Sequence, residues 1–369
     1  MKIYTALGDL PATFAALNAG QTAIAPVNRG FAGIGATISI LDVFDNDSRI
    51  SPLLDLVLSS FPELPEETVP ITATTKAGID DLERCMRRAG KDTGKKILPH
   101  WLTLHVRRRL GLNRSGFAVS AACASSTIAL AQGAKAIASG RADSVLIVCA
   151  DIVSEFVLRG FDSLKALDSR ACRPFDRDRA GLSLGEGAAA IHLVSEKSAN
   201  RSQSPMLGEI MGWGMACDAV HITAPARDGR GLIRAIRIAL ERAGLSSEEV
   251  GAVNAHGTGT IYNDAMELTA IKAVFGDRPL PVYSVKGAVG HTMAAAGGVE
   301  AVLGLASLHT GLVPPTVGLE QPDKEGRGYV SGQGMDLPGE VVMTTNSGFG
   351  GINAALVLGQ AGREECSLA

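Results

Sequence analysis

The sequence predicts an α/β fold built around largely buried sheets. Short apolar runs rich in β-branched residues alternate with helical stretches along the chain, and 43 of the 369 residues are glycine. Aromatic residues make up only 4% of the chain. With few bulky side chains between them, helices and strands can approach one another closely. Hydrophobic residues make up 46% of the chain, which is enough for a large core.

Five segments have the length and composition of buried strands, and two have the apolar spacing of helices. The predicted strands are residues 143–151, 187–196, 250–257, 280–287 and 353–359. The predicted helices are 231–245 and 299–311, each closed by a glycine. Residues 42–100 cannot be assigned in this way, because Pro62, Pro65 and Pro70 interrupt the pattern and "GKDTGKK" is typical of a polar loop. We expect no chemistry in that segment.

The composition excludes several functional classes. A formal net charge of −3 gives no indication of general binding to nucleic acid or anionic membranes. Asp9 and Pro11 interrupt any signal-peptide core, and no apolar stretch is long enough to span a bilayer. The cysteines lack the CxxC spacing of zinc sites, and their scatter argues against a disulfide framework; they are Cys85, Cys123, Cys149, Cys172, Cys217 and Cys366. We therefore expect a cytoplasmic protein without a bound metal.

Cys123 is the first candidate for chemistry. It follows a run of small residues in "SAACASS" and directly precedes a predicted helix that continues to Ile137 and stops at Gly140. The hydroxyl residues 125–127 are candidate caps for that helix. The thiol would face the positive end of the helix dipole, where the thiolate is favoured. A cysteine among alanines is also typical of a packed core, so both interpretations stay open at this point.

Two histidines stand in similar surroundings. "NAHGTGT" places His256 at a strand end followed by glycines, and "SVKGAVGHT" does the same for His291. Imidazoles at glycine-rich strand exits can reach a shared cavity. The alternative for each is a structural histidine that is hydrogen bonded within the core.

The C-terminal segment "TTNSGFGGINAALVLG" predicts a strand, a glycine turn and a second strand. The turn resembles a phosphate-binding loop, but it lacks the third glycine of GxGxxG and precedes a strand instead of a helix. A dinucleotide site is therefore not expected. Closely spaced glycines allow a backbone to approach a substrate, and Phe349 is the one bulky side chain among them.

Taken together, these blocks resemble the β-ketoacyl synthases, the decarboxylating condensing enzymes of fatty-acid and polyketide synthesis that share the thiolase fold. The likeness runs from about Phe117 to Leu358, roughly two-thirds of the chain. The blocks agree in order and spacing; they are "AACASS", "GFDSLKALDSRACRPFDRDRAGLSLGEGAAA", "CDAVHITAPARDG", "NAHGTGTIYNDAMELTAIKAVFG", "SVKGAVGHTMAAAGGVEA" and "NSGFGGINA".

The resemblance implies a catalytic set. Cys123 would accept an acyl chain from a carrier-protein thioester, and His256 and His291 would promote malonyl decarboxylation and stabilise the enolate. Lys286 matches the lysine that supports the site, and Glu300 matches its usual carboxylate partner. A Cys–His–His set is similar to that of the elongating branch of the family.

The resemblance also implies binding residues, and Glu300 is counted among them. Thr258 and Thr260 match positions that hydrogen-bond the phosphopantetheine arm. Phe349 and Phe161 match pocket residues, and Phe349 would gate the acyl channel. The backbone N–H groups of Cys123 and Phe349 are candidates for the oxyanion donors that the tetrahedral intermediate needs.

At the level of architecture, the resemblance implies two αβαβα halves stacked in a five-layered α-β-α-β-α arrangement. Residues 1–195 would form the half with the nucleophile, and residues 196–369 the half with the two histidines. It further implies that acyl and malonyl thioesters arrive on an acyl carrier protein, and that no organic cofactor is bound. The chain would form a homodimer, or a heterodimer with a related ketosynthase-like subunit, in fatty-acid, polyketide or polyene biosynthesis.

Two departures from the family pattern concern the pocket. Ser347 occupies the position of the first Phe in the usual NSFGFGG block, and the N-terminal portion is shorter than usual. We therefore expect a pocket that differs from that of ordinary fatty-acid enzymes. One alternative is a non-catalytic subunit like a chain-length factor, but such subunits characteristically lose the cysteine. Another is a non-decarboxylating acyltransferase, which would release no carbon dioxide.

Overall fold

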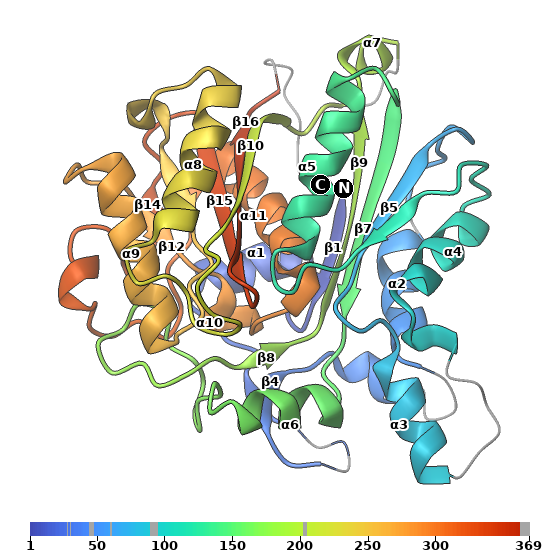
Figure 1. Ribbon diagram of the computed structural model, residues 1–369, viewed down its shortest axis with the longest axis horizontal. Helices are drawn as coiled ribbons and strands as arrows, with labels where there is room; N and C mark the ends of the chain where they lie inside the picture. Colours follow the sequence, from blue (N-terminus) through green and yellow to red (C-terminus); the bar gives the residue numbers. More distant parts are fainter. Residues whose placement is uncertain are drawn as a thin grey trace.

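The chain folds into five alternating layers of helices and sheets (Figure 1). The computed structural model describes residues 1–27, 29, 31–43, 48–59, 61–88, 95–201 and 205–361. Cys366 and most of the "GKDTGKK" segment lie outside these residues. No helix of the described part is long and apolar enough to cross a membrane.

The first sheet contains six strands in the order β2-β1-β9-β7-β5-β6. At its centre β7 (Ser144–Asp151) pairs parallel with β5 (Val69–Ala73) and antiparallel with β9 (Gly187–Val194). All eight residues of β7 are buried, as an apolar run in a covered sheet requires. The other strands are β1 (Lys2–Thr5), β2 (Gly8–Asp9) and β6 (Phe117–Val119).

The second sheet contains five strands in the order β10-β16-β15-β11-β12. The predicted C-terminal hairpin is confirmed, because β15 (Val341–Gly348) and β16 (Ile352–Gly359) pair antiparallel across the glycine turn. β11 (Ala252–Asn254) runs parallel to both β15 and β12 (Val282–Tyr283). β10 (Glu209–Cys217) forms the opposite edge beside β16.

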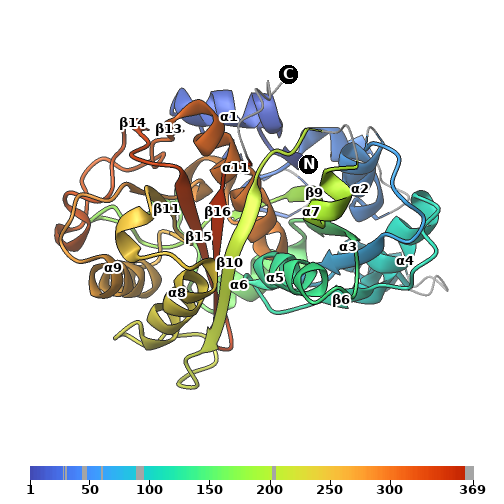
Figure 2. The same ribbon diagram turned by 90° about the horizontal axis from the view of Figure 1, so that it is seen from above.

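Two helices fill the space between the sheets. α5 (Ser125–Ala138) and α11 (Ala296–Thr310) contact each other and both sheets, as the two views show (Figures 1 and 2). Small residues allow this close packing: a Cβ on Gly298 of α11 would collide with Sγ of Cys149 in β7. The scarcity of bulky side chains in the sequence therefore allows the helices of the central layer to pack closely against the sheets, as expected.

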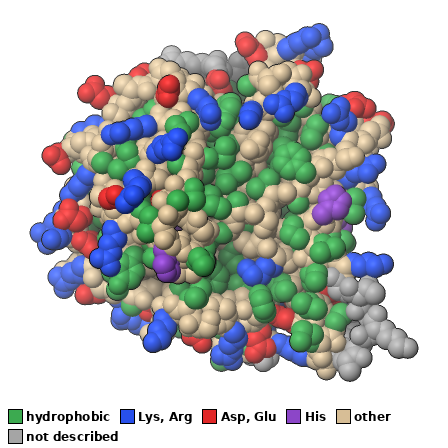
Figure 3. Space-filling view, viewed as in Figure 1, with side chains coloured by type: hydrophobic (Ala, Val, Ile, Leu, Met, Phe, Trp, Pro, Cys, Tyr) green, Lys and Arg blue, Asp and Glu red, His purple; other side chains and the backbone are tan. Residues whose placement is uncertain are grey.

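Outer helices complete the five layers. α2 (Ile50–Leu58) and α4 (Pro99–Arg109) cover the first sheet, and α8 (Arg230–Ala243), with α9 (Ile261–Phe275) beside it, covers the second (Figure 2). The predicted α-β-α-β-α arrangement is thus confirmed. In Figure 3, basic and acidic side chains are interspersed over one face of the molecule, in keeping with the small net charge.

The remaining elements are short or peripheral. The helices are α1 (Leu10–Asn18), α3 (Ile79–Arg88), α6 (Glu155–Ser163), α7 (Glu196–Ala199) and α10 (Lys286–Val289). The 3-10 turns are η1 (Ser39–Val43), η2 (Lys95–Ile97), η3 (Ser247–Glu249), η4 (Met293–Ala295) and η5 (Lys324–Gly326). The short strands are β3 (Ala25–Pro26), β4 (Ile34–Ala36), β8 (Leu184–Gly185), β13 (Leu312–Val313) and β14 (Met335–Asp336).

The sequence-based assignments fail in two informative places. The predicted strands 250–257 and 280–287 shrink to β11 and β12, because the chain leaves the sheet there to carry His256 and Lys286. The unassigned segment 42–100 contains the interior strand β5, whose second residue is Pro70. A proline so near the start of a strand removes few ladder hydrogen bonds. The strands of the first sheet lie between residues 2 and 194, and those of the second between residues 209 and 359. The division of the chain into two halves at residue 195 stays a prediction.

Candidate active site

Cys123 lies on a sharp turn between β6 and α5. The preceding residue, Ala122, has φ +48°, a left-handed conformation that costs energy for a residue with a Cβ. The hydroxyl of Ser125 holds this turn together: it donates to the carbonyl of Ala122 at 2.6 Å and accepts from the N–H of Ala121 at 2.8 Å. The thiol therefore lies one residue ahead of the helix N-cap, Ala124.

The hydroxyl residues expected to cap α5 do not do so. Ala124 occupies the N-cap position without a side-chain hydrogen bond, which corrects that expectation. The hydroxyl of Ser126 instead accepts from the N–H of Gly298 in α11 at 2.9 Å. That of Thr127 donates to Oδ1 of Asn346 in β15. These side chains connect α5 to its neighbours, because the start of this helix is buried and the partners are at hand.

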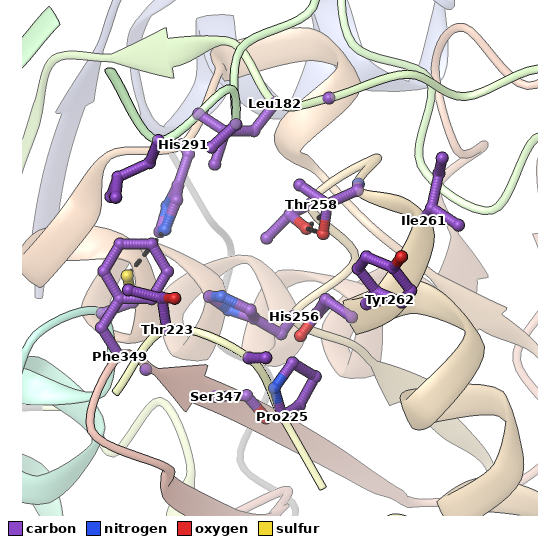
Figure 4. Close-up of a pocket in the computed structure, with 18 of the residues that line it drawn as sticks. Leu182, Thr223, Pro225, His256, Thr258, Ile261, Tyr262, His291, Ser347 and Phe349 are labelled. Atoms are coloured by element: carbon purple, nitrogen blue, oxygen red, sulfur yellow. Dashed lines mark hydrogen bonds between the residues drawn. The ribbon is translucent and has the colours of Figure 1, made fainter. Parts of the chain in front are cut away.

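The fold brings His256 and His291 to Cys123 (Figure 4). Nε2 of His291 lies 2.9 Å from Sγ of Cys123. The two imidazole rings stand edge to face, with centroids 5.1 Å apart and an interplanar angle of 84°. Each of the three residues is buried. The shared cavity expected from the two glycine-rich strand exits is therefore present.

Hydrogen bonds to the other ring nitrogen set the tautomer of each histidine. Nδ1 of His291 accepts from the N–H of Met293 at 3.3 Å, so the ring proton is on Nε2. Nδ1 of His256 lies 3.2 Å from Nδ2 of Asn346. The same amide donates to Oε2 of Glu300 at 2.7 Å, and a carboxylate accepts only from a donor. His256 must then carry its proton on Nε2 as well.

Lys286 and Glu300 form a buried pair that contacts the surroundings of His256. Both are 1% exposed and form an ion pair, and Nζ of Lys286 also donates to the carbonyl of His256 at 2.5 Å. Neither residue is among the described residues that line the cavities. The structure thus places Glu300, expected among the binding residues, in the support of the site.

Burial controls the protonation states. Burial, with a further contribution from the positive charge of Lys286, holds the pKa values of His256 and His291 well below the ordinary range, so both rings are neutral. Burial raises the pKa of Cys123 to about 12, although the charges of Lys286 and Lys76 act in the opposite direction. The expected preference for thiolate is therefore outweighed before substrate binds, and the thiol is protonated.

The glycine turn approaches Cys123 closely. A Cβ on Gly348 would lie 3.2 Å from the backbone nitrogen of Cys123 and 3.2 Å from Cβ of Ala122. Only a glycine allows this approach without a shift of the neighbours. The turn carries Phe349 (Figure 4), and both Cys123 and Phe349 line the cavity into which their N–H groups are expected to point.

Two cavities meet at the thiol. The first, of about 340 Å³, is lined by Cys123, both histidines and the hydroxyl pair Thr258 and Thr260, whose oxygens lie 2.9 Å apart. The second, of about 370 Å³, shares Cys123, Phe161, Leu164 and Phe349 with the first. The rings of Phe161 and Phe349 have centroids 5.7 Å apart. This aromatic pair borders both cavities, which is the position that a gate requires.

Ser347 changes the polarity of the first cavity. Its hydroxyl donates to Oδ1 of Asn353 at 2.7 Å, and Nδ2 of Asn353 in turn donates to Oδ1 of Asp218 at 2.8 Å. All three residues line the cavity. A hydrogen-bonded polar wall therefore stands where a phenylalanine would place an aromatic ring.

The site also contains a possible metal-ligand set. One donor atom each of Cys123, His256 and His291 lies within 4.8 Å of the others, and thiolate with imidazole is a donor combination that Zn²⁺ accepts. The Nε2–H groups that face the thiol would have to lose their protons to bind a metal. The absence of a metal from the working protein stays a prediction.

Sequence reasoning missed two contributors, Asn346 and Lys76. Asn346 belongs to the "NSGFGG" block and is fully buried, but its partners Thr127, His256 and Glu300 are distant in sequence. Lys76 lies in the segment where no chemistry was expected, yet it lines the second cavity. No pattern in the sequence signals either one.

Comparison with known proteins gives two family matches. A model described as "Beta-ketoacyl synthase, N-terminal domain" matches residues 87–199, and one described as "Beta-ketoacyl synthase, C-terminal domain" matches residues 207–320.

Two curated relatives are similar in sequence. A 3-oxoacyl-[acyl-carrier-protein] synthase 2 of Synechocystis sp. is 39% identical over 245 residues, which cover 64% of this chain and 59% of the relative. Nodulation protein E of Rhizobium meliloti is 38% identical over 275 residues, which cover 73% of this chain and 67% of the relative. The chain thus spans less than two thirds of the Synechocystis protein.

A solved structure described as the ishigamide ketosynthase/chain length factor is similar over nearly the whole chain. Its TM-score is 0.88 at 29% identity, and the match covers 98% of each chain.

Proposed function

Because the chain belongs to the β-ketoacyl synthase family, we propose that it is an acyltransferase that condenses an acyl thioester with malonyl-[acyl carrier protein]. One observation carries this proposal: two neutral imidazoles, each with its proton on Nε2, face the thiol of Cys123 inside one cavity. This arrangement supplies a nucleophile and two donors for a developing oxyanion.

In the first step, Cys123 takes the acyl chain from its carrier. Sγ attacks the thioester carbonyl and forms a new S–C bond; the bond to the pantetheine sulfur breaks, and the proton of Cys123 ends on the leaving thiol. The Nε2–H of His291, 2.9 Å from Sγ, stabilises the thiolate as the proton leaves. The backbone N–H groups of Cys123 and Phe349 are the proposed donors to the tetrahedral intermediate.

In the second step, malonyl thioester loses carbon dioxide and its bonding electrons form an enolate. The enolate oxygen accepts from Nε2–H of His256 and His291, which are neutral and therefore still carry these protons. The enolate carbon then attacks the acyl-Cys123 carbonyl, a C–C bond forms, and the S–C bond breaks. The Cys123 thiolate takes a proton from solvent, which restores the thiol.

The partners belong to the same proposal. The carrier protein would deliver the pantetheine arm along the first cavity, past Thr258 and Thr260, and Phe161 with Phe349 would separate that arm from the acyl chain. A dimer, either of two copies or with a related subunit, is supported by the similarity to the ketosynthase/chain length factor. Free thiols at Cys123, Cys149 and Cys172 suit a reducing cytoplasm.

The experiment is to supply acyl-loaded carrier protein and malonyl-carrier protein labelled in the free carboxyl carbon. The proposal predicts release of labelled carbon dioxide and a β-ketoacyl product two carbons longer than the primer. Acyl transfer without carbon dioxide would favour the non-decarboxylating alternative. Neither carbon dioxide nor product would favour the non-catalytic partner-subunit role, although the complete Cys–His–His set argues against that role.

A further inference from the structure

Among the residues that the structure describes, the second cavity has an apolar wall and one charged side chain. Phe156, Val157 and Phe161 of α6, together with Met293 and Phe349, form the apolar part. Lys76 lines the same cavity, accompanied by Thr75 and Ser120. A chain attached to Cys123 that enters this cavity therefore meets both apolar and polar side chains.

Lys76 has no partner among the residues that the structure describes. No hydrogen bond or ion pair joins its ammonium group to any of them. The nearest acidic residue in sequence, Asp80, is already engaged, because it accepts from the hydroxyl of Ser48 and the N–H of Arg49. Asp151 is engaged too: it accepts from Thr74, from the N–H and hydroxyl of Thr75, and from the N–H of Ala294. Its carboxylate is thus directed at the backbone around Lys76 and not at its ammonium.

The acidic residues of the neighbouring helices are engaged as well. Glu155 at the start of α6 forms ion pairs with Arg87 and Arg159. Oε1 of Glu83 in α3 accepts from the N–H of Phe156. Lys76 is partly buried, and none of these groups neutralises its ammonium. An anion that enters the cavity can therefore pair with it.

The charge of Lys76 also acts on the nucleophile, because it lowers the pKa of Cys123 against the effect of burial. The ammonium therefore lies within electrostatic range of the thioester position. An acyl chain on Cys123 that enters the second cavity shares that cavity with this ammonium, and the hydroxyl of Ser120 offers a second donor there.

We propose that the second cavity selects an acyl primer with a carboxylate at its distal end, and that Lys76 is the counter-ion of that carboxylate. This inference rests on the proposed function, because it names the primer class that Cys123 would accept. An unbranched hydrocarbon primer of the same length would leave Lys76 unpaired, whereas a carboxylate forms a charge-assisted hydrogen bond with it.

The test compares ω-carboxyacyl and alkyl chains of equal length on the same carrier protein. Adipyl-carrier protein is set against hexanoyl-carrier protein, with succinyl/butyryl and suberyl/octanoyl pairs to cover chain length. Acylation of Cys123 is followed by intact mass at early times, which measures the first step alone. We expect the carboxylate member of at least one pair to react about tenfold faster or more, the size expected for a hydrogen bond between charged groups.

Two variants identify the residue. Lys76→Met keeps the length of the side chain without its charge and should remove the preference, and Lys76→Glu should reverse it. Lys135→Met, at an exposed lysine of α5, is the charge-matched control and should keep the wild-type ratio. Because each variant is judged by the ratio of two primers on one carrier, a general loss of reactivity does not imitate the effect.

Three outcomes would overturn the proposal: equal rates for both members of every pair in the wild type, faster alkyl acylation throughout, or an unchanged preference in Lys76→Met. If Lys76→Met slows both primers equally, the lysine assists the thiol alone and the proposed specificity is wrong. Failure of the proposed function looks different, because no primer of either kind would then acylate the wild type.

Discussion

Nδ2 of Asn346 lies 3.2 Å from Nδ1 of His256 and joins it to the carboxylate of Glu300. This contact determines which nitrogen of His256 carries the proton, and therefore what the ring can do. With the proton on Nε2, a neutral imidazole donates to an enolate oxygen. The carboxylate that orients the amide is itself paired with Lys286. A chain of contacts therefore runs from this ion pair through Asn346 to the imidazole of His256.

The first prediction concerns Asn346. Asn346→Leu has a similar size but cannot donate to Nδ1, so His256 loses the contact that fixes its tautomer. Malonyl decarboxylation should fall about tenfold or more, whereas acylation of Cys123 should be nearly unchanged. Carbon dioxide release and intact mass measure the two steps separately. Equal loss of both steps, or no loss in decarboxylation relative to an exposed control such as Asn200→Leu, would contradict this role.

The second prediction concerns His291 and the thiol. His291→Ala removes the Nε2–H that lies 2.9 Å from Sγ of Cys123 and stabilises its thiolate. Alkylation of Cys123 by iodoacetamide should therefore slow by about tenfold, as expected for loss of a hydrogen bond to a charged group. Peptide mapping of the alkylated residue measures the rate at this one cysteine. His100→Ala, at an exposed histidine, is the control, and a rate in His291→Ala that equals or exceeds this control would refute the argument.

The third prediction concerns the buried pair Lys286 and Glu300. Lys286→Met leaves Glu300 charged and 1% exposed, so the free energy of unfolding should fall by about 3–5 kcal/mol. Glu300→Gln added to Lys286→Met removes that stranded charge and should recover part of the loss. Urea denaturation of the single and double variants measures both effects. A loss below about 1 kcal/mol in the single variant would mean that the pair is not isolated from water.

The fourth prediction concerns pH. Because the pKa values of His256 and His291 are lowered in the folded protein, both rings stay neutral as the pH falls through about 6.5. Decarboxylation by Cys123→Ala, which lacks the titrating thiol, should thus change little between pH 8 and pH 6. If half of this activity were lost near pH 6.5, the pKa values of the two imidazoles would not be lowered, and this explanation would be wrong.

The same shifts have a consequence for stability. In the unfolded chain these histidines gain protons below about pH 6.5, whereas the folded rings do not, so unfolding takes up protons. The contribution of the two neutral rings to the free energy of unfolding is complete above that pH. It is lost as the pH falls, by up to about 1.4 kcal/mol per pH unit for each ring. Urea denaturation at pH 7.5 and pH 5.5, with and without His291→Gln, measures this dependence.

Much of the site follows from local sequence. Glycines beside His256 and His291, and small residues before Cys123, mark places where the chain leaves a regular element and points a side chain into a cavity. The strands β7, β9 and β16 are recognisable because each is a mostly buried run of eight residues in which apolar residues and glycine predominate. In each case the signal lies within a few residues of the feature that it predicts.

The missed features depend on contacts between distant segments. Ser126 and Thr127 are expected to cap their helix, but the packing of α5 against α11 and β15 gives them other partners. Pro70 makes the interior strand β5 hard to recognise in the sequence, and Lys76, which follows that strand, is therefore missed. Burial is likewise a property of the assembled layers, which is why the helix N-terminus alone gives the wrong protonation state for Cys123.

The measurement that tests the central claim most directly is the intact mass of the protein after incubation with acyl-loaded carrier protein. The account predicts that the wild type gains the mass of the acyl group and that Cys123→Ala, under the same conditions, gains none. Addition of malonyl-carrier protein should then remove the adduct and release the β-ketoacyl product. An unmodified wild type over a range of primers, or an equal adduct on Cys123→Ala, would contradict the claim that Cys123 is the nucleophile.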